Sequence, residues 1–251
     1  MSTFFDPELL QTNYFSEYAR AKEKTRGPVY FNPYRNYDIL VSLLESIADY
    51  KLDHARSYAK RIKSQENDWN NCEGVFTEII IYGYYLRLVS EGFVRSLKLQ
   101  TDECDIIVER ADGIVMYLEA FCVMPRIELS KEDAIVVNDI KTHTQDALSS
   151  IRQKLLRKFE KQRQFSKPRE NYAVIELNDG SIIGDFHVLS SISDGYKITI
   201  GQETGKIVSR WFDWSRTFLA EPAAQYLRGL IWFDLGNYDG RRILLNPYFR
   251  P

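Results

Sequence analysis

Three apolar runs follow one another between residues 93 and 123, and they constrain the fold more than any other part of the chain. They read FVRSLKL, CDIIVER and GIVMYLEAFCVM, with turn residues between them. Runs rich in β-branched and aromatic residues, separated by turn residues, are typical of antiparallel strands. A helical pattern follows from about residue 144 to 163, and NYAVIEL is the next predicted strand. Because a helix that joins two strands of one sheet is the parallel crossover unit, we expect an α/β (α+β) fold with a mixed central sheet.

Helical patterns precede these strands. Apolar residues recur at helical spacing between residues 38 and 65, and a second helix is expected up to Gly92, with Asn70 or Asn71 as its N-cap. After residue 178 the runs SIIGDFHVL, YKITIG and KIVSRWF predict short strands, and the last segment is expected to start as a helix and finish as a strand. We therefore expect a helical N-terminal extension (1–70), an α/β core (71–178) and a β-rich C-terminal extension packed on that core (179–251).

The charges of the chain nearly cancel, which limits how it can bind nucleic acid. Its 251 residues carry 33 Lys and Arg against 35 Asp and Glu, a net charge of −2 with histidine neutral. A protein that coats nucleic acid along its whole surface needs an excess of cations. Any binding of phosphates must therefore be local.

Membrane and zinc chemistry are also disfavoured. Charge-free runs such as residues 79–86 are far shorter than the ~18 apolar residues of a membrane span, and the N-terminus lacks the pattern of a secretory signal. Cys72, Cys104 and Cys122 form no zinc pattern with the three histidines. We expect a cytoplasmic protein with reduced, structural thiols that does not bind membranes and is a possible homo-oligomer.

Three acids between residues 78 and 119 are the candidate metal ligands of the chain. Asp105 lies in CDIIVER, and Glu119 lies inside an otherwise apolar strand, where an ionised group is costly unless it is paired or binds a cation. The hairpin between them brings the two acids onto neighbouring strands, close enough to share a hard cation such as Mg²⁺. Glu78, on the preceding helix, is a candidate third ligand. The simpler alternatives are backbone amides around Asp105 and an ion pair of Glu119 with Arg87 or Arg95.

In the order of these elements the chain resembles the PD-(D/E)XK nuclease superfamily, which has the restriction-endonuclease-like fold. The resemblance covers residues 73–178 and consists of the helix with Glu78, the strand with Asp105, the strand with Glu119, a basic helix and the strand NYAVIEL. It implies that the two acids bind a catalytic Mg²⁺ or Mn²⁺. It also implies a lysine two positions after the second acid, which positions or activates the attacking water.

The chain departs from this pattern because Phe121 occupies the position of that lysine. One explanation is that Lys154 or Lys158 on the following helix supplies the ammonium group. Both lysines are therefore candidate catalytic residues, together with Asp105 and Glu119. A second is that the motif lies at Asp139-Ile140-Lys141, although this register leaves Glu119 without a role. A third is a fold that has lost catalysis.

A local cluster of cations supports nucleic acid as the partner. Eight cations and one acid, Glu160, lie between residues 152 and 169, a local charge of +7. Such a stripe is typical of a phosphate-binding surface, although a basic helix face is often only solvated. The cations are Arg152, Lys154, Arg157, Lys158, Lys161, Arg163, Lys167 and Arg169, of which the first six are the predicted nucleic-acid contacts.

The expected function is Mg²⁺-dependent hydrolysis of phosphodiester bonds in nucleic acid, with DNA as the preferred substrate. The alternative is an inactive nuclease-fold module that binds nucleic acid or a protein partner. A third possibility is a scaffold whose C-terminal hairpins form an oligomer interface.

Overall fold

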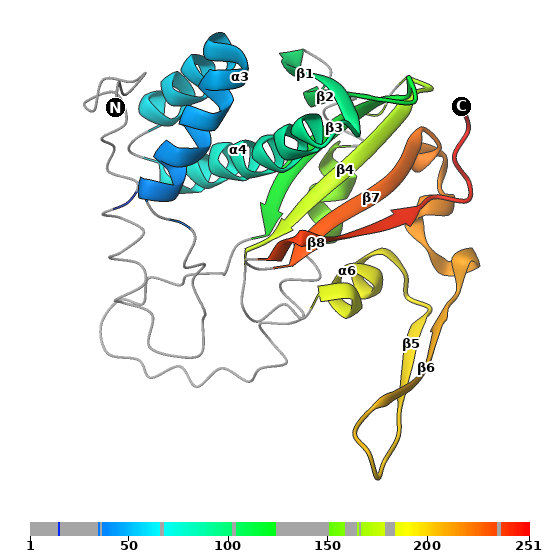
Figure 1. The fold of residues 1–251 in the computed structure, drawn as a ribbon. Coiled ribbons are helices and arrows are strands. Elements are labelled where there is room, and N and C mark those ends of the chain that lie inside the picture. Colours follow the sequence, from blue (N-terminus) through cyan, green and yellow to red (C-terminus); the bar gives the residue numbers. More distant parts are fainter. Residues whose placement is uncertain are drawn as a thin grey trace.

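The computed structural model of the chain shows a mixed α/β fold in which helices cover both faces of one six-stranded sheet (Figure 1). The sequence-based expectation of an α/β (α+β) protein with a mixed sheet is confirmed. The alternative motif at Asp139-Ile140-Lys141 and the cations Lys161 and Arg163 lie outside the described residues. The structure describes residues 15, 35, 37–65, 68–101, 104–123, 151–158, 165, 167–178, 184–234 and 237–251.

The sheet begins with the predicted meander. Three antiparallel strands follow one another, β1 (Val94–Thr101), β2 (Cys104–Arg110) and β3 (Val115–Val123). Next to β3 lies β4 (Glu170–Leu177), which is the expected strand NYAVIEL and is parallel to β3. The sheet continues with β7 (Leu227–Asp234), parallel to β4, and ends with the antiparallel β8 (Asn237–Leu245). The C-terminal region therefore extends the central sheet, whose order is β1-β2-β3-β4-β7-β8.

Two helices form layers on one face of the sheet. α4 (Trp69–Ser90) contacts β1, β2 and β3 directly, and α3 (Tyr37–Ser64) packs on α4. Because α4 lies between α3 and the sheet, it is apolar around most of its circumference. Its N-cap is Asp68, whose side chain accepts from the backbone N–H of Asn71. The expectation of Asn70 or Asn71 as the cap was wrong, since the helix starts before both of them.

The opposite face of the sheet is covered by helical residues 151–158 and by α6 (Gly184–Ile192). The strand predicted at SIIGDFHVL was wrong from residue 184 on. Val188 and Ile192, one helical turn apart, are both buried in the core with Ile151 and Leu155. Burial of this i, i+4 pair against the sheet outweighs the weak strand propensity of the segment.

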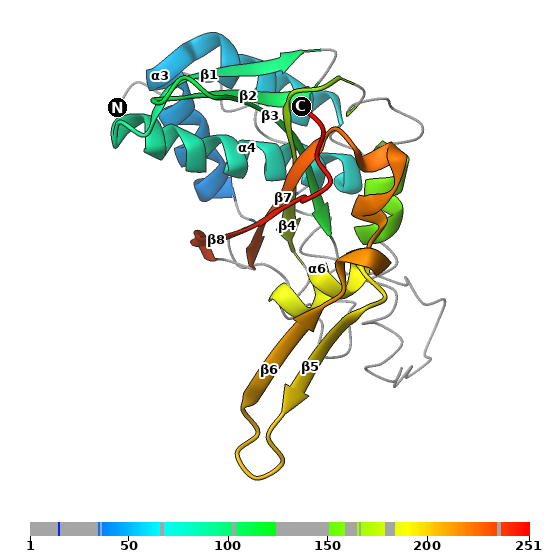
Figure 2. The same cartoon turned by 90° about the vertical axis from the view of Figure 1, so that its right-hand side faces the viewer.

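A two-stranded ribbon projects from the body of the protein (Figure 2). It consists of β5 (Tyr196–Ile200) and β6 (Ile207–Phe212), as predicted from the sequence. Three single-turn 3-10 helices then lead back to the sheet, so the helix expected at the start of the last segment is reduced to one turn. They span Trp214–Arg216, Phe218–Ala220 and Pro222–Ala224.

A buried polar cluster joins α4 to the end of β4. Arg35 Nε donates to Glu73 Oε2 at 2.7 Å, and its Nη2 donates to Glu176 Oε2 at 2.5 Å. Thr77 also donates to Glu176, and Asn178 Nδ2 donates to Glu73 at 2.9 Å. Since the side chains of both glutamates are at most 1% exposed, the guanidinium of Arg35 offsets much of the cost of burying them.

Two expectations from the sequence concern the thiols and the membrane. All three cysteines are buried and free. Within the part of the chain that the structure describes, every helix is too short or too polar to cross a membrane.

Replacing Arg35 with methionine is expected to destabilise the protein by about 3–5 kcal/mol, because Glu73 and Glu176 would remain buried without their cation. The free energy of unfolding, measured with denaturant, checks this. Arg56→Met serves as the control, since the Arg56 side chain is 62% exposed, and should change stability by less than about 0.5 kcal/mol. Equal effects of the two substitutions would contradict a structural role for Arg35.

Candidate acidic metal site

The site lies where β2 and β3 stop pairing. The last paired residues at this end of the ladder are Ile106 and Leu118, and Asp105 and Glu119 are the next residue of each strand. Beyond the ladder, Asp105 Oδ2 accepts a hydrogen bond from the backbone N–H of Ala120 at 2.8 Å. The simpler expectation for Asp105, a bond with a neighbouring backbone amide, is thus met at one oxygen. The same bond holds its carboxylate beside Glu119.

Glu119 is the most deeply buried of the three candidate acids, with 2% of the residue exposed. Its Oε1 forms an ion pair with the ammonium group of Lys158. The expected arginine partners were wrong, because Arg87 pairs with Glu91 and Arg95 pairs with Glu109. The other oxygen, Oε2, is buried and has no hydrogen-bond partner in the described structure.

The surroundings of Glu119 favour its protonated form. Burial and the nearby Asp105 carboxylate raise the pKa of Glu119 to about 8, while the ammonium of Lys158 acts in the opposite direction. A bound cation would lower this pKa by stabilising both negative charges.

Two lysines surround the phenyl ring that stands at the motif position. The ammonium groups of Lys154 and Lys158 lie 6.0 and 5.8 Å from the centre of the Phe121 ring. Lys154 donates to the backbone carbonyl of Cys122 at 2.5 Å, and Lys158 reaches Glu119. Because Lys154 and Lys158 are four residues apart on the 151–158 helix, both side chains point toward the sheet. Of the two candidates, Lys158 contacts the acidic pair.

Glu78 stands beside this pair and is held by α3. Its two oxygens accept from Arg61, with distances of 2.5 Å to Nη1 and 2.7 Å to Nη2. Burial raises the pKa of Glu78 to about 7, and the Asp105 carboxylate adds to the rise, whereas Arg61 opposes it. Arg61 donates one hydrogen bond to each oxygen of Glu78, and the role of Glu78 as a metal ligand stays a prediction.

Two residues of the site, Arg61 and Tyr58, were not predicted from the sequence. Both belong to α3, in the region assigned to an N-terminal extension. The Tyr58 hydroxyl is buried without a hydrogen-bond partner in the described structure, and burial together with the Glu78 carboxylate raises its pKa well above the usual value. Arg61 lies one turn after Tyr58, with its guanidinium 5.8 Å from the Tyr58 ring. The spacing of three residues between Tyr58 and Arg61 in a predicted helix was the signal that could have placed both on its buried side.

The donor set can be compared with what Mg²⁺ or Mn²⁺ requires. Asp105 and Glu119 offer hard oxygen ligands, and the partnerless Glu119 Oε2 is an oxygen that a cation could use. The described residues contain no group of three or more His, Cys, Asp or Glu side chains arranged to hold a metal ion. Asp105 and Glu119 thus supply two hard oxygen donors, and a cation held by them would need its remaining ligands from water and substrate.

The predicted basic stripe does not form one uniform surface. Lys154 and Lys158 point toward the site, whereas Arg157 on the same helix is exposed. Arg152 pairs with Asp194 at 3.2 Å, and Arg169 stacks 3.9 Å from the centre of the Tyr117 ring. The part of the stripe that the structure describes is thus divided between the site and the surface.

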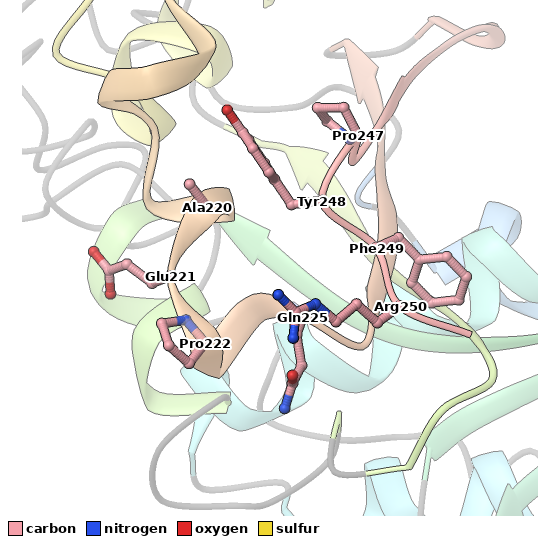
Figure 3. A pocket seen from close by; sticks show the side chains of 8 residues that line it. All are labelled: Ala220, Glu221, Pro222, Gln225, Pro247, Tyr248, Phe249 and Arg250. Carbon is pink, nitrogen blue, oxygen red and sulfur yellow. The ribbon is translucent and has the colours of Figure 1, made fainter.

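Two surface hollows lie away from the acids. One, of about 350 Å³, lies between the 3-10 turns and the C-terminal residues 247–250 (Figure 3). The backbone N–H of Arg250 donates to the carbonyl of Gln225 there. The other, of about 480 Å³, lies at the tip of the β5–β6 ribbon. Neither hollow is lined by an acid of the candidate site.

Comparisons of the chain with protein families, with curated proteins and with solved structures found no match.

The raised pKa of Glu119 predicts how stability depends on pH. Between about pH 4.5 and 8 the folded protein keeps a proton that the unfolded chain has lost, so the free energy of unfolding should fall as pH rises through this range. The slope is at most about 1.4 kcal/mol per pH unit for each such proton. Urea unfolding at several pH values measures it, and Glu119→Gln should flatten the curve. An unchanged slope in that variant would show that Glu119 is ionised.

Proposed function

We propose that this protein is a metal-dependent nuclease that hydrolyses phosphodiester bonds, with DNA as its substrate. The observation that carries the proposal is the ammonium group of Lys158 beside Glu119. The ring of Phe121 cannot stabilise negative charge at the motif position, and Lys158 brings the missing charge from the next helix. An acidic pair with an adjacent ammonium is the donor set that such hydrolysis needs.

We also propose that the fold is restriction-endonuclease-like. Its support is the order of the elements: α4, the β1–β2–β3 meander, the 151–158 helix, and β4 parallel to β3. In this arrangement α4 and the 151–158 helix cover opposite faces of the sheet, and Lys158 of the second helix contacts Glu119 beyond the end of the β2–β3 ladder. The order of these elements and the parallel pairing of β4 with β3 are what supports this proposal.

Each side chain has a defined task in this proposal. Asp105 and Glu119 would hold Mg²⁺ or Mn²⁺, which when bound polarises the phosphate and lowers the pKa of a water ligand. Lys158 would leave its ion pair with Glu119 to stabilise the negative charge that develops on the phosphate. Asp105 is kept in place by the Ala120 amide, and Arg61 keeps the charge of Glu78 neutralised. The exposed Arg157 would bind phosphates outside the site.

One observation favours a second candidate, a nuclease-fold module that binds nucleic acid without cleaving it. The Glu119 side chain is only 3% exposed and is already paired with Lys158. An ion pair that is stable without metal could replace the metal permanently, as a buried pair is costly to break. The two candidates differ in whether a divalent cation displaces Lys158 from Glu119.

Cleavage of plasmid and of single-stranded DNA in Mg²⁺ or Mn²⁺ tests the proposal. Asp105→Asn and Glu119→Gln should each lower the rate at least 100-fold, since each removes a charge that binds the cation. Asp53→Asn is the matched control, because this aspartate is 85% exposed on α3. Cleavage that survives Asp105→Asn would overturn the site. Metal-independent DNA binding without cleavage by the wild type would favour the second candidate.

The role of Lys158 has its own test. Lys158→Ala should lower the cleavage rate about 100-fold or more, whereas Arg157→Ala, its exposed neighbour, should mainly weaken DNA binding. Adding Phe121→Lys to Lys158→Ala restores an ammonium group at the motif position and should recover part of the rate. Thermal unfolding must show that both variants are folded, because Phe121 is buried. A folded Lys158→Ala variant with full activity would exclude Lys158 from catalysis.

A further inference from the structure

The β5–β6 ribbon is firmly anchored at its base. The rings of Tyr196 and Phe212, a cross-strand pair, contact each other with their centres 6.1 Å apart, and Phe186 and Trp214 extend this cluster. Arg210 pairs with Asp185 at the start of α6 at 3.5 Å. A ribbon held in this way keeps a fixed direction relative to the sheet.

On the rest of the ribbon, large apolar side chains are exposed to water. Val208 is 69% exposed, and Ile200, Trp211 and Ile207 are 53%, 52% and 47% exposed. Ten large hydrophobic residues of the described structure are at least 37% exposed, and four of them lie in this one ribbon. Such a concentration on a projecting element is typical of an interaction surface.

The backbone of β6 is available for pairing as well. In the described structure β6 pairs with β5 alone, so its outer edge leaves a row of N–H and C=O groups unbonded. The register shift next to Ile200 leaves Val208 without a residue opposite it in β5, and this bulge contributes to its exposure. An apolar strand with a free edge pairs readily with another strand.

We infer that the ribbon is a dimerisation arm, in which the outer edge of β6 pairs antiparallel with β6 of a second copy of this chain. The strand is self-complementary when the two-fold axis passes through Ser209. This alignment sets Ile207 of each copy opposite Trp211 of the other, and it sets Val208 opposite the aliphatic part of Arg210. Centring on Arg210 would oppose two guanidinium groups, and centring on Val208 would oppose Lys206 and Arg210.

A second copy accounts for the ribbon better than nucleic acid does. Arg210 is already paired with Asp185, and Lys197 lies 5.6 Å from the centre of the Trp211 ring, so the ribbon offers few free cations. Its largest exposed groups are apolar, as in the cores of homodimer interfaces. The inference does not depend on the proposed function, since it concerns a different surface.

Sedimentation velocity over a range of protein concentrations tests the inference. The wild type is expected to be a dimer, and Val208→Asp should raise the dimer dissociation constant at least 100-fold. Phe93→Asp is the matched control, because Phe93 is 66% exposed before β1 and should leave the dimer intact. A wild type that stays monomeric at every concentration, or a dimer that Val208→Asp leaves unchanged, would overturn the inference.

Cysteine cross-linking identifies the edge that pairs. Ser209→Cys places a thiol at the two-fold axis, so mild oxidation should give a disulfide-linked dimer. Thr199→Cys is the matched control, because Thr199 lies directly opposite Ser209 on β5. The native cysteines are buried and should give little background. Faster cross-linking through Thr199→Cys would overturn the assignment to the β6 edge.

Discussion

Burial of carboxylates is the constraint on which much of this structure depends. Four glutamates, Glu73, Glu78, Glu119 and Glu176, lie in the interior, and each is compensated by a cation from a part of the chain remote in sequence. Since an uncompensated buried charge costs several kcal/mol, these pairings fix which elements can pack together. Arg35, which precedes α3, joins α4 to β4, Arg61 joins α3 to α4, and Lys158 joins the 151–158 helix to β3.

The acids of the candidate site are less fully compensated than those of the Arg35 cluster. Glu73 and Glu176 share hydrogen bonds with Arg35, Thr77 and Asn178. At the site, by contrast, Glu119 Oε2 and the Tyr58 hydroxyl are buried and lack partners within the described residues. Asn178 Oδ1 in the Arg35 cluster is also buried without a partner among the described residues, so what sets the candidate site apart is the raised pKa of Glu78 and Glu119. Raised pKa values of neighbouring acids are typical of a functional site.

The sequence predicted the meander, its parallel neighbour and the acidic pair, because alternating apolar runs and hairpin turns are local signals. It did not reveal Arg61 or Tyr58 at the site, since a helix pattern shows which face is buried and not which residues of other elements that face contacts. The failure at α6 has a similar cause, because tertiary burial of Val188 and Ile192 decides the conformation of a segment with ambiguous propensity. The contact of Lys158 with Glu119 was one of two alternatives, and only the packing of the helix separates Lys158 from Lys154.

The Arg35 cluster also has a consequence for the order of folding. Arg35 and Glu176 are 141 residues apart in the sequence, and Thr77 and Glu176 are 99 residues apart. Contacts with such long separations are slow to form, because the intervening chain must first be ordered. On the ribosome, the start of α3 can be fixed against β4 only after β4 has been synthesised. Until then Arg35 can pair only with Glu73, and the second carboxylate that shares its guanidinium arrives with β4.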